Sequence, residues 1–170
     1  MDKIPRDIIY FVPQYLDSGD GVMLLLLNGE KKVCHMSIRS FTKKLYSMYA
    51  IDPFTIKKLI SKKIGQKNLL PIVLPDVTFI PVKTRKAKVA TDPIFGYVNL
   101  SQVFKIDEKE EGFEILFKCG AVLQCFGSAK YFKRRITAAS IISDYFSSMW
   151  AKGVCTIKEE CELENVFSLE

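Results

Sequence analysis

Four cations lie close together in the segment KTRKAK, residues 83–88: Lys83, Arg85, Lys86 and Lys88. The segment contains no acid and follows an apolar run that is stopped by Pro81. Lysine ammonium groups and the planar arginine guanidinium bind phosphate in proteins, and the hydroxyl of Thr84 can donate to the same group. The segment therefore predicts a site for phosphate groups, carried either by a nucleic acid or by anionic lipid head groups.

On DNA, the arginine and the lysines of this segment are expected to act differently. Arg85 is the expected groove reader, because arginine enters the narrow, negative minor groove of A/T-rich duplexes well. Lys83, Lys86 and Lys88 are expected on flanking phosphates. Further candidates for contacts with the DNA backbone lie on two expected helices: Lys58, Lys62, Arg134 and Arg135. For the lysines on helix faces, the alternative is an ordinary solvated surface that keeps the protein soluble.

Positive charge is concentrated in the middle of the chain. The net charge is +6 with a pI of about 9.0, and residues 31–90 contain fourteen lysines and arginines against two acids. The segment EECELENVFSLE, residues 159–170, has five glutamates and no cation. This asymmetry leaves three interpretations open for the acidic tail: a solvated segment, a segment that competes with DNA for the cations, or an apolar docking element for another subunit or a regulatory protein.

Catalytic and metal chemistry find little support in the sequence. The single histidine, His35, adjoins Cys34 on an expected strand, which favours a partly buried structural pair. The pairs Cys119–Cys125 and Cys155–Cys161 lack the short ligand spacing of a zinc site. No glycine-rich phosphate-binding motif is present. The sequence therefore predicts a protein that is not an enzyme and that uses no metal or cofactor.

The compartment can also be inferred from residue types. The five cysteines are odd in number and loosely spaced, which is typical of proteins whose thiols stay reduced. The first residues lack the pattern of a secretory signal, and the apolar run at 22–27 is too short to span a bilayer. We therefore expect a cytoplasmic protein with no membrane insertion.

Short apolar runs and turn residues predict an α+β fold. Apolar runs at 8–16, 22–27 and 32–36 are separated by turn sequences, which predicts a three-stranded meander. Helical periodicity follows at 37–50. A second helix is expected within 52–65, where Asp52 is the N-cap, Pro53 the first helical residue and Gly65 the stop. Residues 70–82 then return to extended chain.

The second half predicts another antiparallel unit. Residues 96–106 are expected to form one strand, followed by a solvated turn. A hairpin at 113–126 with a two-residue Cys119-Gly120 loop would place Phe117 opposite Val122 and Phe113 opposite Phe126. A long helix capped by Ser128 and ended by Gly153 carries an apolar stripe that would cover the sheet. The expected architecture is antiparallel β-meanders with a two-helix insertion and a long C-terminal helix packed on the sheet, in one domain (1–153) with an acidic tail (154–170).

The order of these elements resembles the competence transcription factor (ComK) family of Gram-positive bacteria. The resemblance covers roughly residues 35–150 and consists of a pattern of apolar positions and prolines. The residues that carry it are Pro71-Ile72-Val73-Leu74, Phe79-Ile80-Pro81, Tyr97 and the hairpin tip Cys119-Gly120.

The resemblance implies a DNA-binding transcription activator. Members of that family recognise paired A/T-rich boxes of double-stranded DNA, largely through the minor groove, and bind as multimers, so a homo-oligomer and control by a proteolytic adaptor are expected. The sequence leaves two alternatives open: a non-catalytic module for anionic membrane surfaces, and an adaptor that binds a protein partner through the apolar face of the 37–49 helix.

Overall fold

Nine strands and three α-helices make up the described part of the chain, residues 5–152 of a computed structural model. The strands are β1 (Ile8–Leu16), β2 (Gly19–Leu26), β3 (Lys31–Cys34), β4 (Ile72–Leu74), β5 (Val77–Lys83), β6 (Phe95–Asn99), β7 (Val103–Glu108), β8 (Phe113–Phe117) and β9 (Val122–Cys125). The helices are α1 (Ile38–Met48), α2 (Pro53–Ile64) and α3 (Ala129–Ala151), with short 3₁₀ turns η1 (Pro5–Asp7) and η2 (Leu100–Gln102).

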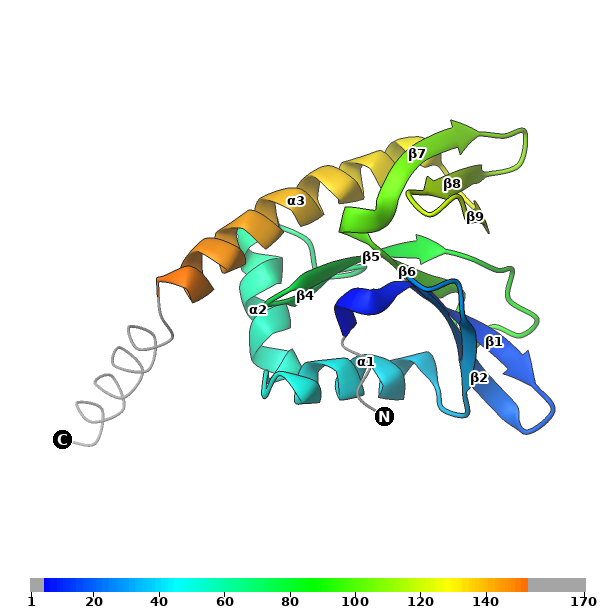
Figure 1. Cartoon of the computed structure of the whole chain (residues 1–170), viewed down its shortest axis with the longest axis horizontal. Coiled ribbons are helices and arrows are strands. Elements are labelled where there is room, and N and C mark those ends of the chain that lie inside the picture. The colour runs from blue at the N-terminus through cyan, green and yellow to red at the C-terminus, as the bar shows by residue number, and fades with distance from the viewer. Residues whose placement is uncertain (1–4, 153–170) are drawn as a thin grey trace.

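The strands form two antiparallel sheets (Figure 1). The larger sheet has the order β3-β2-β1-β6-β5-β4, and the smaller has the order β7-β8-β9. The two halves of the larger sheet meet where β1 pairs with β6, with Tyr10 opposite Val98 and Phe11 opposite Tyr97. The expected α+β fold, its two-helix insertion and the long helix α3 packed on the sheet are confirmed.

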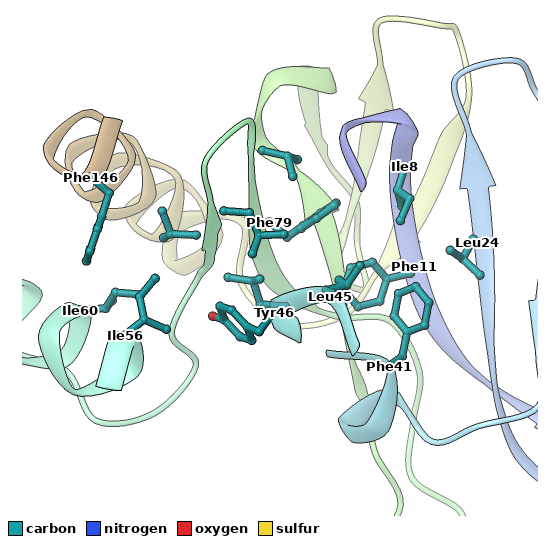
Figure 2. Close-up of a cluster of buried hydrophobic side chains, with 14 of the residues drawn as sticks. Ile8, Phe11, Leu24, Phe41, Leu45, Tyr46, Ile56, Ile60, Phe79 and Phe146 are labelled. Atoms are coloured by element: carbon teal, nitrogen blue, oxygen red, sulfur yellow. The ribbon is translucent and has the colours of Figure 1, made fainter. Parts of the chain in front are cut away.

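Each face of the larger sheet contributes to its own core. Phe11 points to the face covered by α1, α2 and the second half of α3, where its ring lies 4.9 Å from Phe41 and 5.2 Å from both Phe79 and Tyr97, centroid to centroid. Figure 2 shows this core, with Phe146 of α3 beside the α2 isoleucines. Tyr10 points to the other face, which packs on the smaller sheet and the first half of α3.

The helix signals in the sequence are largely confirmed. The Asp52 side chain accepts a hydrogen bond from the Thr55 amide, and Gly65 adopts a left-handed φ of 71°, so α2 begins and ends as predicted. Ser128 occupies the N-cap position of α3 but makes no side-chain capping bond. The predicted end of that helix, Gly153, and the acidic tail lie outside the described residues. The apolar stripe of α3 is buried through Phe132, Ala139, Ile142 and Phe146.

The single strand predicted for 96–106 is wrong, because the chain breaks there and changes sheet. β6 ends at Asn99, η2 follows, and β7 belongs to the smaller sheet. The buried Asn99 side chain donates to the carbonyl oxygen of Ile8 at 2.9 Å and accepts from the amide of Ser101 at 3.1 Å. Asparagine thus ends the strand by an Asx-type turn and fixes this turn against the start of β1.

The predicted register of the second hairpin is also wrong by one residue. Leu116 lies opposite Val122, and Phe113 lies opposite Cys125. The amide of Gly120 donates to Phe117, and Gly120 takes the left-handed φ of 89°. A three-residue loop is therefore preferred over the predicted two-residue loop, which would have required a positive φ at Cys119.

Replacement of Asn99, whose side-chain amide is buried, should destabilise the junction between the two sheets. Asn99→Ala leaves the carbonyl of Ile8 without its 2.9 Å donor, and such a buried unpaired group costs about 1–3 kcal/mol in free energy of unfolding. Urea denaturation measures this loss. Ser101→Ala is the control, because it removes only a part-buried hydroxyl bond to the same amide oxygen. Equal unfolding midpoints for the two variants would contradict a special role for Asn99.

Candidate nucleic-acid interface

The basic segment lies at the junction of β5 with the loop of residues 84–94, here called the β5–β6 loop. Lys83 is the last residue of β5, and the amide of Thr84 donates to the carbonyl of Ile94 at 2.9 Å, which closes the base of the loop. In Figure 1 this loop projects at one end of the larger sheet, beside the β1–β2 hairpin. The segment is therefore held at the end of two paired interior strands, β5 and β6.

Asp92 organises the tip of the β5–β6 loop. Its carboxylate accepts hydrogen bonds from the amides of Lys88 at 2.7 Å and Val89 at 3.0 Å, and from the hydroxyl of Tyr15. The Tyr15 bond and these amides lower the pKa of Asp92, and the same bond raises the pKa of Tyr15. The one carboxylate of the loop, Asp92, is thus occupied by hydrogen bonds from backbone amides and from the Tyr15 hydroxyl.

Arg85 does not have the placement expected of a groove reader. Its guanidinium lies 3.8 Å from the ring centroid of Tyr15, and its Nε donates to the carbonyl of Pro93 at 2.6 Å. One Nη atom lies 3.9 Å from the carboxylate of Asp20, and the side chain is only 13% exposed. Arg85 therefore joins the loop to the β1–β2 hairpin, and in this conformation its planar fork is not presented to solvent.

Thr84 also differs from its predicted role. Its hydroxyl oxygen is buried and has no hydrogen-bond partner within residues 5–152. The side-chain methyl lies near Gly96, against the neighbouring strand β6. The Thr84 hydroxyl is consequently not available to a phosphate in this conformation.

The lysines of the segment are the groups that remain accessible. Lys86 and Lys88 are exposed, and Lys83 is partly exposed. The Nζ atom of Lys88 lies 4.2 Å from the ring centroid of Tyr15, and that of Lys86 lies 5.6 Å from Phe126. Within residues 5–152, no carboxylate forms an ion pair with any of these three lysines.

Of the two predicted cations in the first turns of α3, Arg135 lies beside the basic segment. Arg135 donates to the carbonyl of Pro81 at 3.3 Å, lies 5.7 Å from the ring centroid of Phe95, and has a pKa lowered by burial. The amide of Phe126 donates to the carbonyl of Lys83 at 2.8 Å, which fixes the chain before α3 beside the basic segment. The neighbouring Arg134 is exposed and lines a shallow pocket with Glu108 of β7, Lys130 and Lys133. We call the surface made by Lys83, Lys86, Lys88 and Arg135, with the exposed Arg134 one residue away on α3, the basic face.

The other two predicted cations belong to a different part of the molecule. Lys58 and Lys62 are exposed on α2. Figure 1 shows α2 at the opposite end of the view from the β5–β6 loop. Lys58 and Lys62 therefore do not join the basic face.

Sequence reasoning missed Tyr15 and Asp92, the residues that fix the loop. They are separated by 77 positions in the chain and come together only because β1 pairs with β6. No local pattern marks Tyr15, which is one of several aromatic residues in an apolar strand. The short spacing from Lys88 to Asp92 was the one available signal, since aspartate commonly accepts backbone bonds in tight turns.

Other chemistry has little structural support in the described region. Among residues 5–152, no group of three or more His, Cys, Asp or Glu side chains could hold a metal ion. His35 is exposed, with Nδ1 lying 3.3 Å from the Ser18 hydroxyl, and Cys34 is partly buried. None of the helices in residues 5–152 is both long and apolar enough to cross a bilayer.

Comparison with known proteins adds no further assignment. No family model matches the chain, and no curated protein or solved structure matches it either.

The Tyr15–Asp92 contact should control how the β5–β6 loop responds to acid. Because the pKa of Asp92 is lowered, the folded loop favours the carboxylate, and this contribution is present above the ordinary pKa of about 3.9 and lost as pH falls through the lower folded value. Tyr15→Phe removes the largest cause of the shift and should raise the midpoint of the titration. NMR titration of the Asp92 carboxyl carbon and the Lys88 and Val89 amides measures this midpoint.

The same spectra contain an internal control. The pKa of Asp107 is lowered through Lys105, which makes no use of Tyr15, so its titration should not change in the Tyr15→Phe variant. An unchanged Asp92 midpoint in the variant would show that the phenol does not stabilise the carboxylate.

Proposed function

We propose that this protein binds duplex DNA through the basic face. The observation that supports this proposal best is that the three lysines have no carboxylate partner in the described part of the chain. Lys83 at the end of β5 and Lys86 and Lys88 on the hydrogen-bonded loop have no carboxylate partner in residues 5–152, because the loop's one acid, Asp92, accepts hydrogen bonds from Tyr15 and backbone amides. Cations that are fixed in place but not neutralised favour binding to a polyanion, with release of its counterions.

Aromatic rings support the cations of this face. Tyr15 lies beneath Arg85 and Lys88, Phe126 beneath Lys86, and Tyr131 beside Arg134. Each ring contacts the side chain within 6 Å of its centroid, which favours a cation held near the ring face. These long side chains are therefore already partly ordered in the free protein, so they lose less conformational entropy when they bind DNA.

The division of roles within the face follows from exposure. The exposed lysines contact phosphates and Arg85 positions the loop. The exposed Arg134, rather than the mostly buried Arg85, is the arginine assigned to a narrow A/T-rich minor groove. Selectivity for A/T-rich DNA, transcription activation, multimer formation and a proteolytic adaptor are proposals that rest on the resemblance to competence regulators. The protein would act without catalysis or a cofactor, in the cytoplasm.

Removal of the three lysines should weaken binding to all duplexes alike. For the variant Lys83→Ala/Lys86→Ala/Lys88→Ala, we expect the slope of log affinity against log salt to become shallower by about one unit for each phosphate that is no longer neutralised. Fluorescence anisotropy with A/T-rich and G/C-rich duplexes over a salt series gives both quantities. In the same assay, Arg134→Ala should reduce the preference for A/T-rich DNA.

The matched control is Lys58→Ala/Lys62→Ala, which removes exposed charge from α2 and should leave the salt slope nearly unchanged. If the control flattens the slope as much per lysine as the variant does, net charge is sufficient and the basic face has no special role. Liposomes with anionic lipids form the second arm. Wild-type binding to these vesicles, with no binding to any duplex at low salt, would refute the DNA proposal.

A further inference from the structure

A groove of about 640 Å³ lies between α1, the first turn of α2 and the residues that lead into β6. Its apolar lining includes Ile38, Phe54, Leu69, Ile94 and Phe95. The Phe54 side chain is 76% exposed, and Leu69 is 36% exposed with a left-handed φ of 54° that leucine seldom adopts. Residues 5–152 therefore leave these apolar side chains of the groove uncovered.

The groove also carries unbalanced positive charge. Arg39, Lys43 and Lys57 line it, and no carboxylate of residues 5–152 pairs with them. The one acid in the lining is Asp92, whose carboxylate already accepts bonds from Tyr15 and two loop amides. Apolar walls with unopposed cations suit a peptide in which apolar side chains alternate with carboxylates.

We infer that this groove binds residues 159–170 of the same molecule. That segment, EECELENVFSLE, has five glutamates and no cation to oppose Arg39, Lys43 and Lys57. Its apolar residues are Leu163, Val166, Phe167 and Leu169, of the kind that could cover Phe54 and Leu69. The match is thus one of both charge and apolar character.

The end of α3 lies within reach of the groove. The Nζ atom of Lys63, in the last turn of α2, lies 4.5 Å from the ring centroid of Tyr145 on α3. Lys57 in the groove lies about 9 Å along the α2 axis from Lys63, at 1.5 Å per residue. Tyr145 lies seven residues, or about 10 Å of helix, before Lys152, the last described residue. Residues 153–158 can span about 20 Å when extended and the twelve residues after them about 40 Å more, so the acidic segment can reach the groove of its own molecule.

The inference does not depend on the proposed DNA binding, and a photocrosslink tests it in the full chain. Phe54→p-benzoylphenylalanine places a probe on the exposed groove residue. Trypsin cleaves after Lys158 and releases residues 159–170 as one fragment, because this segment contains no lysine or arginine. Mass spectrometry should find that fragment joined to the α2 peptide after irradiation. A mixture of ¹⁵N-labelled and unlabelled protein should give crosslinks within one molecule only.

Two controls test where the segment binds. Adding Arg39→Glu, Lys43→Glu and Lys57→Glu should lower the crosslink yield about tenfold, whereas Lys44→Glu, Lys58→Glu and Lys62→Glu make the same charge change outside the groove and should leave the yield nearly unchanged. A probe at Leu59, which is 46% exposed on α2 but outside the groove, should not capture the fragment. No crosslink to residues 159–170, equal capture from Leu59, equal loss in both charge variants, or crosslinks only between labelled and unlabelled molecules would overturn the inference.

Discussion

The pairing of β1 with β6 is the contact on which the rest of the structure depends. It joins residues separated by most of the described chain and unites two three-stranded units into one sheet. The close approach requires a glycine, because a Cβ atom at Gly96 would lie 2.9 Å from the carbonyl oxygen of Phe11. This pairing places the Phe11 ring among three others in the core. It also carries the far end of β1 to the start of β6, so that Tyr15 meets Asp92.

The candidate site follows from this long-range contact. The ring of Tyr15 packs against the guanidinium of Arg85, and its hydroxyl bonds to Asp92. One side chain from β1 thus contacts both the start and the end of the β5–β6 loop. The acids of this region hold the loop, and no carboxylate of residues 5–152 pairs with Lys83, Lys86 or Lys88. The proposed peptide groove shares Asp92 and Pro93 with the loop, although the two surfaces carry separate sets of cations.

The parts of the fold set by local chemistry could be predicted from the sequence. Turn residues define the first meander, and Asp52, Pro53 and Gly65 define α2. The change of sheet at Asn99 could not be predicted, because it depends on bonds to Ile8, 91 positions away. For the same reason composition could not show that Arg85 is mostly buried, because its burial depends on Tyr15. A pattern read within a short window cannot show which distant aromatic ring will cover a cation.

The proposed DNA-binding surface is tested most directly by a map of the DNA contacts at single-residue resolution. Backbone amide resonances of the full chain would be followed by NMR during titration with an A/T-rich duplex at low salt. We expect the shifts to concentrate in residues 83–90 and 126–135, with little change in α1 and α2. Shifts confined to α1 and α2, or no shifts with any duplex, would contradict the assignment of the basic face as the DNA-binding surface.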